Sequence, residues 1–386
     1  MTTITNEQLQ EMLLKGAVSI GQVAEEECQL ADVNSIISQR VIDLIKDKGI
    51  HKLILPKRYG GPQINFGLFT EFIRTVGYYN LSAAWLTYFY SVHNSWLAFL
   101  PEHRQQEILR TDGLLADVFA PVGNVVRVEG GFILNAIYHY VSGIKYSEWI
   151  AVGAKYKNEK EEVQFLGLVF HTSNLTIKED WDSLGLRGTG SNTIIVNDLF
   201  IPDDMVIDMD QITKDRKPLN QDYDEDYLYY NVPFQPAFYV GFPAMAIGGA
   251  KRAIEEFKMY TAKRIHGFGE SEKESPRSQR VVAVVSIKLV TAKSLMEKYI
   301  TMLETDTGQH SPSEFKMIRS EIIQLCVDIA VKCLLTLGAS ALLKGNPIEM
   351  ITRDLLALAT HNTSLYEDAM DVYGKHLFGY PTTIRG

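Results

Sequence analysis

The sequence predicts an α+β fold in which two helical regions flank one compact β region. Apolar residues recur at helical spacing before about residue 114, short runs with strand propensity fill 115–205, and long amphipathic patterns follow. Because strands and helices are segregated rather than alternating, a βαβ dinucleotide fold is not expected. We therefore predict three domains: helical 1–114, β 115–205, and a helical bundle 206–386.

The first region is predicted to be helical with one interruption. Apolar residues from Val33 to Ile45 follow a helical period, and Gly49 suits a helix end. Segment 55–62 is rich in proline and glycine, which predicts a loop. Helical pattern then resumes from Phe66 to about Leu109.

The middle region contains five strand-like runs separated by turn residues. They are 125–128, 131–134, 149–154, 163–171 and 193–196. Segment 203–233 is acidic and is predicted to be a connecting loop. The helical patterns after it cover 244–263, 281–302 and 315–337.

Composition excludes several classes of protein. The chain has 386 residues, a formal net charge of -9 and three cysteines. The charge argues against a nucleic-acid partner, and the cysteines are too few for a disulfide framework. No signal peptide and no apolar run of about 18 residues is evident, so we expect a cytoplasmic protein without a membrane partner. No cysteine-rich zinc motif is present, and we predict no metal site.

The glycine-rich segment 187–192 does not predict a nucleotide loop. It precedes the strand-like run 193–196, whereas a Rossmann or P-loop glycine run follows a strand and opens a helix. If the protein is a redox enzyme, we therefore expect its electrons to arrive by a route other than a nicotinamide bound in such a loop.

Short motifs in a shared order resemble the acyl-CoA dehydrogenase superfamily over nearly the whole chain. In chain order they are LPKRYGG (55–61), YVSG (140–143) followed by Trp149, LGLRGTGS (184–191), Arg264 with Phe268 and Gln279, and NPIEMITRD (346–354). The resemblance implies an N-terminal helical domain, a middle β-barrel or sandwich, a C-terminal four-helix bundle and a homotetramer built as a dimer of dimers.

A further set of motifs resembles the oxygenase components of two-component flavin monooxygenases, such as the p-hydroxyphenylacetate hydroxylase oxygenase and dibenzothiophene monooxygenase. These are SVHNSW (91–96), APVG (120–123) and RDLLALATH (353–361). Two departures are a single serine, Ser142, where many such enzymes have two, and Glu349–Met350 where they have Gln-Arg. The resemblance implies reduced FMN or FAD from a separate flavin reductase, oxygen as co-substrate, and a C4a-hydroperoxyflavin that oxygenates a small aromatic, sulfur or amine substrate.

The position that carries the catalytic glutamate of acyl-CoA dehydrogenases falls on Asn362, which has no basic site. The alternative position, on the helix before the double glycine, is also empty, since 235–249 contains no acid. Two other hypotheses stay open: an acyl-CoA dehydrogenase or oxidase with an atypical base, and a non-catalytic flavin-binding homologue. Exposure of His361 to bulk solvent, with no pocket beside Ser142, is expected for the last of these.

The resemblance implies specific site residues. The predicted catalytic residues are Ser142, hydrogen-bonded to the flavin, His361, near the oxygen adduct, and His93, on the substrate side. The predicted flavin-binding residues are Phe119, Ala120, Tyr140, Ser142, Arg264, Phe268 and Gln279, and the predicted substrate pocket contains His93, Asn94, Trp96, Phe238 and Asn362. Trp85 and Trp96 are interpreted as core residues from their apolar surroundings.

Overall fold

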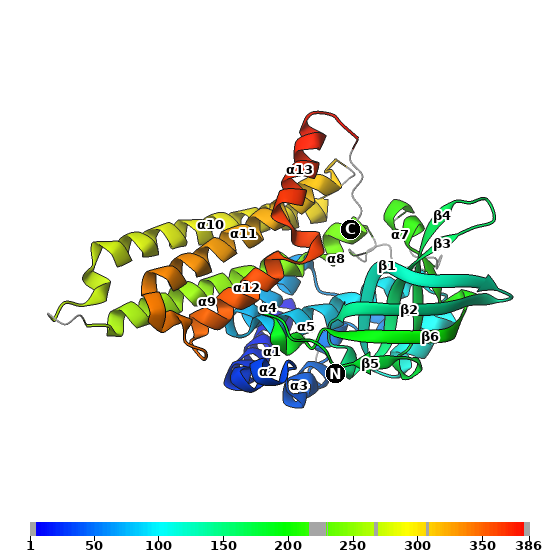
Figure 1. Ribbon diagram of the computed structural model, residues 1–386, viewed down its shortest axis with the longest axis horizontal. Helices are drawn as coiled ribbons and strands as arrows, with labels where there is room; N and C mark the ends of the chain where they lie inside the picture. The colour runs from blue at the N-terminus through cyan, green and yellow to red at the C-terminus, as the bar shows by residue number, and fades with distance from the viewer. Residues whose placement is uncertain (1–4, 216–228, 230, 266–268, 306–308, 382–386) are drawn as a thin grey trace.

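A computed structural model describes residues 5–215, 229, 231–265, 269–305 and 309–381. Its helices and strands are segregated as predicted, with a sheet at one end and a long helical bundle at the other (Figure 1). The predicted α+β class is confirmed.

The N-terminal region is helical. Its elements are α1 (Asn6–Glu26), α2 (Cys28–Asn34), α3 (Gln39–Asp47), α4 (Phe66–Tyr79), α5 (Leu81–Val92), α6 (Glu102–Arg110) and the 3₁₀ segments η1 (Ile50–Lys52), η2 (Lys57–Tyr59) and η3 (His93–Phe99). Every residue of α5 is buried, because this helix lies against α4, α9, α12 and the first strand. Helix α5 therefore joins the three regions of the fold and carries side chains into the space between them.

The strands form one seven-stranded sheet in the order β5-β6-β2-β1-β3-β4-β7. They are β1 (Leu114–Val128), β2 (Gly131–Val141), β3 (Ser147–Lys157), β4 (Val163–His171), β5 (Thr176–Lys178), β6 (Asn192–Pro202) and β7 (Val206–Asp208). Strands β1 and β3 are parallel, and the other neighbours are antiparallel. Each predicted strand run lies inside one of these strands, and the sheet covers 114–208.

Strand β1 leaves the regular ladder in its middle. Its pairing with β3 shifts register between Val118 and Gly123, and it pairs with β2 only from Asn124 onwards. Residues 119–122 therefore form a bulge, a feature that often re-aims chain beside active sites. Gly153 of β3 permits this, because a Cβ there would lie 2.6 Å from the Phe119 carbonyl oxygen.

The C-terminal region is the predicted bundle. Helices α9 (Gly241–Lys263), α10 (Pro276–Thr305), α11 (Pro312–Leu337) and α12 (Pro347–Ala359) lie side by side (Figure 1), with α8 (Phe234–Phe238), η9 (Glu272–Glu274), η10 (Gly338–Leu342), η11 (Asn362–Ser364) and α13 (Tyr366–Leu377) around them.

The loop predicted over 203–233 is wrong for its first part. Residues 203–205 form a 3₁₀ turn, η7 (Asp203–Met205), β7 pairs with β4, and α7 (Met209–Asp215) buries Ile212. Apolar side chains thus anchor this part to the sheet. Residues 216–228 and 230 lie outside the described residues.

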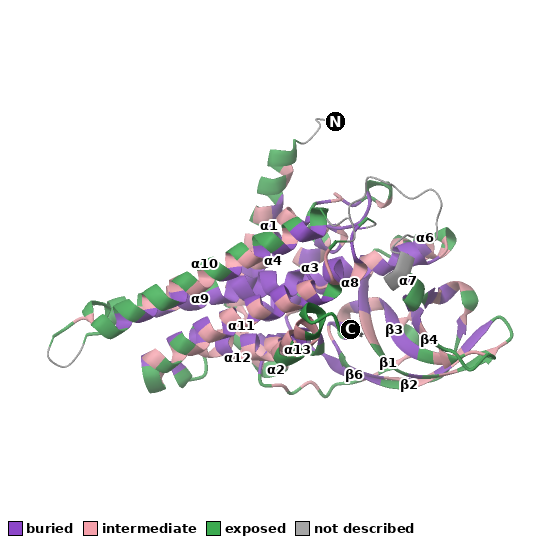
Figure 2. Ribbon diagram, turned by 90° about the horizontal axis from the view of Figure 1, so that it is seen from above, coloured by how far each residue is buried: buried purple, intermediate pink, exposed green. Residues whose placement is uncertain are grey.

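Helix α11 is long and apolar enough to cross a membrane, although the sequence analysis finds no such run. In the fold α11 contacts α9, α10, α12 and α13, and half of its most apolar stretch is buried. Figure 2 shows the buried residues of the bundle gathered where these helices meet. The apolar character of α11 is that of a core helix.

Candidate active site

Ser142 lies just after β2, where it takes part in a chain of hydroxyl hydrogen bonds. The Trp85 indole N–H donates to Ser142 Oγ at 2.9 Å, Ser142 and Ser191 are 2.8 Å apart, and Ser191 and Thr189 are 2.7 Å apart. Thr189 donates its proton to the Leu186 carbonyl at 2.8 Å. Because each hydroxyl has one proton, Ser191 donates to Thr189 and Ser142 donates to Ser191.

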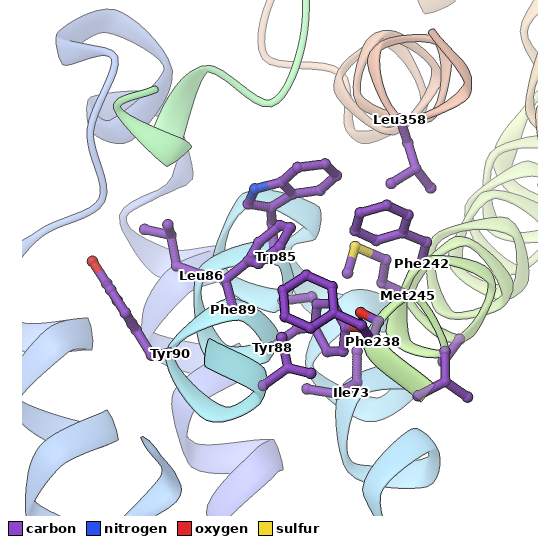
Figure 3. Close-up of a cluster of buried hydrophobic side chains, with 14 of the residues drawn as sticks. Ile73, Trp85, Leu86, Tyr88, Phe89, Tyr90, Phe238, Phe242, Met245 and Leu358 are labelled. Atoms are coloured by element: carbon purple, nitrogen blue, oxygen red, sulfur yellow. The ribbon is translucent and has the colours of Figure 1, made fainter. Parts of the chain in front are cut away.

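An aromatic cluster fills the space beside Ser142. Helices α5, α8 and α9 contribute Trp85, Tyr88, Phe89, Phe238 and Phe242 (Figure 3), and the link between α8 and α9 adds Tyr239. Trp85 stacks on Phe242 with ring centroids 5.0 Å apart and planes 9° apart, and Phe89 lies 5.0 Å from Trp85. The predicted core role of Trp85 is incomplete, since its polar atom contacts a predicted catalytic residue.

His361 is held against this cluster. Its ring lies 5.0 Å from Phe242 and 5.5 Å from Trp85. Its Nδ1 accepts the backbone N–H of Thr363 at 3.3 Å and lies 2.9 Å from the Thr363 hydroxyl. Burial, with the nearby positive charge of Arg319, lowers the pKa of His361 to about 4. The imidazole is therefore neutral at pH 7, and its proton is on Nε2.

His93 is buried next to a buried acid. Its Nδ1 is 2.6 Å from the Leu115 carbonyl, so Nδ1 carries a proton, and its Nε2 lies 3.2 Å from Asp117 Oδ2. Burial lowers the pKa of His93 to about 3 and raises the pKa of Asp117 well above its usual range. Nε2, Oδ2 and the nearby Trp96 Nε1 are all buried without a hydrogen-bond partner. One uncharged pair thus presents polar atoms that a ligand's hydroxyl or N–H group can satisfy.

Three of the other predicted flavin contacts belong to β1 and β2. Phe119 and Ala120 belong to the β1 bulge, and the Phe119 ring lies 6.4 Å from Phe238. Tyr140 is exposed, with its ring 6.2 Å from Trp181. The Trp149 indole N–H is buried without a partner.

Arg264 and Gln279 lie far from Ser142. Both are exposed at the end of the bundle opposite the sheet, beyond the last turn of α9 and at the start of α10 (Figure 1). Arg264 donates to the Leu337 carbonyl at 3.5 Å, and Gln279 to the carbonyls of Lys273 and Glu274 at 3.4 Å. Neither reaches the site of its own chain. Phe268 lies outside the described residues.

The predicted substrate-pocket residues separate into two groups. Phe238 is buried and stacks near His93, with centroids 6.2 Å apart. Asn94 donates to the carbonyls of His51 and Tyr90, Trp96 is fully buried, and Asn362 is exposed. Over the described ranges, no cluster of three or more His, Cys, Asp or Glu side chains suits a metal ion.

The sequence analysis missed Asp117, Arg319 and the polar function of Trp85. A single acid within the apolar run Leu114–Phe119 was a signal for Asp117. Arg319 had a similar signal, because it lies between apolar positions of a helix. Trp85 had none, since aromatic residues surround it in the sequence.

Comparison with known proteins places this fold in a known class. Residues 240–364 match the family model described as acyl-CoA dehydrogenase, C-terminal domain. The solved structure of XiaF from Streptomyces sp., in complex with FADH2 and glycerol, superposes with a TM-score of 0.90 at 19% identity, covering 98% of each chain. The fold is that of the acyl-CoA dehydrogenase superfamily, and the chain is a flavin-dependent oxidoreductase.

Sequence relatives narrow the class. The flavin-dependent monooxygenase oxygenase subunit HsaA of Rhodococcus jostii is 25% identical, covering 88% of this chain and 91% of the relative. The oxygenase component of p-hydroxyphenylacetate 3-hydroxylase from Acinetobacter baumannii is 23% identical, covering 88% and 82%. The predicted resemblance to oxygenase components of two-component flavin monooxygenases is confirmed.

Proposed function

We propose that this protein accepts reduced FMN or FAD from a separate, soluble flavin reductase and oxygenates a small organic substrate at the aromatic cluster. The contact of one indole, Trp85, with both Ser142 and His361 carries this proposal. Ser142 and His361 are distant in sequence, and each has an expected function at the flavin. The fold brings both to the side chain of Trp85. We expect the reaction to take place in the cytoplasm.

Bound reduced flavin supplies the electrons and activates dioxygen at its ring. Ser142 offers a hydroxyl whose oxygen already accepts one hydrogen bond, which polarises its own O–H. His361 offers an N–H donor at Nε2 rather than a proton to release, because its imidazole is neutral. The aromatic cluster excludes water from the reacting group. His93 and Asp117 take the polar group of the substrate.

The bundle end supports assembly as a homotetramer. Helix α9 has 23 residues, so at 1.5 Å per residue Arg264 lies about 35 Å along the helix from Gly241. An arginine at that distance from the site of its own chain is available to the flavin phosphates of a neighbouring chain.

The dehydrogenase alternative needs a carboxylate base beside the flavin. Asn362 is exposed and not basic, and the start of α9 carries no acid. Asp117 is the buried carboxyl of the site, and the experiment below tests it as well. The non-catalytic alternative predicts a solvent-facing His361, whereas His361 packs on Trp85 and Phe242. The non-catalytic alternative also predicts that no pocket lies beside Ser142. This expectation is met in part, since Trp85 occupies the space there.

One experiment separates the three alternatives. The protein is mixed with reduced flavin without oxygen, then with oxygen, and the absorbance is followed by stopped flow. We expect a transient spectrum distinct from those of reduced and oxidised flavin. His361→Ala should shorten its lifetime, while His103→Ala, at an exposed histidine, should not.

Two other outcomes would count against the proposal. Anaerobic bleaching of oxidised flavin by an acyl-CoA indicates a dehydrogenase, and a loss of bleaching in Asp117→Asn then identifies the base. Failure to bind flavin in either redox state indicates the non-catalytic alternative.

A further inference from the structure

Arg319 is a buried cation, and the described part of the chain places no carboxylate beside it. It lies on α11 with 3% of its surface exposed. One of its terminal nitrogens, Nη2, donates to the Thr363 carbonyl, and its guanidinium carbon lies 4.8 Å from the centre of the Tyr239 ring. Its Nε is buried and has no hydrogen-bond partner. Within the described parts of the chain, no carboxylate lies within 4.0 Å of the guanidinium.

Arg319 borders the candidate active site. Its Thr363 partner is two residues from His361, whose pKa its charge helps to lower. Its other partner, Tyr239, belongs to the aromatic cluster, with the Phe242 ring 5.8 Å away. The guanidinium therefore lies at the α11 side of the cluster.

A charge in this position is costly unless a partner reaches it. A guanidinium keeps its charge at every pH at which proteins fold, and an unpaired ion in a dry interior is strongly destabilising. One carbonyl, one ring face and the Tyr299 hydroxyl compensate only in part, because Nε remains unused. A carboxylate matches the planar fork of a guanidinium with two parallel hydrogen bonds and neutralises it.

We propose that Arg319 binds the carboxylate of the substrate, so that the protein acts on an aromatic compound bearing an acidic side chain. This inference rests on the proposed function, because it takes the aromatic cluster as the substrate site. The rings of the cluster receive the aromatic body, and Arg319 receives the charged end. When the substrate binds, its carboxylate forms an ion pair with Arg319, which otherwise has no charged partner among the described residues.

Binding to matched probes tests the inference without knowledge of the natural substrate. Benzoate, phenylacetate and 1-naphthylacetate are each compared with the corresponding amide by calorimetry on the purified full-length protein. Each pair has the same shape and differs by one charge. At least one carboxylate should bind about 30-fold more tightly than its amide, or more, as expected for a buried charge pair.

Variants assign that preference to Arg319. In Arg319→Gln the difference between acid and amide should disappear, and in Arg319→Lys part of it should remain. Arg110→Gln, at an exposed arginine that ends α6, should keep the full difference. Circular dichroism verifies that each variant is folded. If a variant does not fold, the preference of the unaltered protein for acid over amide still tests the inference.

Several outcomes would overturn the inference. They are equal affinity for acid and amide in the unaltered protein, survival of the preference in Arg319→Gln, and failure of all three acids to bind. Competition by inorganic phosphate at equal concentration would also overturn it, because the site would then suit a phosphate such as that of the flavin. The oxygen experiment above uses no carboxylate, so failure of the proposed function is distinguishable from failure of this inference.

Discussion

The indole N–H of Trp85 donates to the hydroxyl oxygen of Ser142 at 2.9 Å. A helix of the N-terminal region and the end of a strand thereby meet through one hydrogen bond, at the position predicted for the flavin. The hydroxyl also donates to Ser191, so its proton and one of its two lone pairs are in use before any flavin arrives. A flavin acceptor must therefore displace Ser191 or make Trp85 reorient, whereas a flavin N–H can donate to the second lone pair.

A double-mutant cycle measures the Trp85–Ser142 bond. Trp85→Phe keeps a ring to stack on Phe242, and Ser142→Ala removes the hydroxyl. Each should lower the free energy of unfolding by about 1 kcal/mol, and the double variant should cost less than the sum, with a coupling of about 1 kcal/mol. Urea unfolding gives the four values.

Repeating the cycle with saturating flavin tests whether the flavin displaces this bond. If flavin takes over the hydroxyl, the coupling between Trp85 and Ser142 should fall toward zero. A coupling that is unchanged by flavin would mean that the flavin does not displace the Trp85–Ser142 bond. Trp181→Phe with Ser142→Ala is the control pair, since Trp181 donates to the Leu186 carbonyl instead.

The pKa of His361 predicts how stability depends on pH. The folded value of about 4 is below the unfolded value of about 6.5. The neutral imidazole therefore contributes stability fully above pH 6.5, and this contribution is lost as the pH falls toward 4. The loss is at most about 3 kcal/mol.

His361→Asn removes this titration and keeps an acceptor for the Thr363 N–H, because asparagine is a good helix N-cap. The free energy of unfolding of the variant should fall less than that of the parent between pH 6.5 and 4. Parallel pH profiles for the two proteins would show that His361 is solvated like an exposed histidine.

The fold was more predictable than the site. Helix and strand periods placed the predicted strands, because each has a local pattern of apolar residues. Trp85, Asp117 and Arg319 acquire their importance from contacts between elements far apart in the chain. On α5, where all twelve residues are buried, no periodicity separates the side that faces Ser142 from the side that packs on α4.

Where local motifs did point to the site, the geometry brought only some residues together. The aromatic cluster includes Phe238 and is contacted by Ser142, His361 and His93. By contrast, Arg264 and Gln279 lie at the opposite end of the bundle. Asn94 resembled a pocket residue because it follows His93. A 3₁₀ turn directs its amide to backbone carbonyls instead. The functions of all these residues at the flavin and the substrate stay predictions.

Asp117 should be a source of instability at high pH. Burial raises its pKa above the unfolded value, although the Trp96 N–H acts in the opposite direction. The protonated carboxyl contributes stability below about pH 3.9, and this is lost as the pH rises toward the folded pKa. Asp117→Asn never ionises, so it should become more stable than the parent by about 1.4 kcal/mol per pH unit over that range.

Urea unfolding from pH 4 to 8 gives this difference. Asp180→Asn is the control, because the Thr193 N–H lowers the pKa of the exposed Asp180, and its substitution should be destabilising instead. A stability difference for Asp117→Asn that is constant with pH would mean that Asp117 is ionised in the folded protein.

The β1 bulge is predicted to shape the flavin site through Gly153. A Cβ at Gly153 would lie 2.6 Å from the Phe119 carbonyl oxygen and 2.7 Å from its carbonyl carbon, both backbone atoms that yield only by moving the bulge.

Gly153→Ala should lower the free energy of unfolding by about 1–3 kcal/mol and weaken flavin binding about tenfold. Gly67→Ala on α4 serves as the control, because the nearest atom to its Cβ would be the Asn65 side-chain oxygen, 3.5 Å away. Alanine there should stabilise the helix by up to about 1 kcal/mol. Flavin titrations followed by fluorescence quenching give the dissociation constants. Unchanged flavin affinity in a destabilised Gly153→Ala protein would show that Phe119 and Ala120 do not contact the flavin.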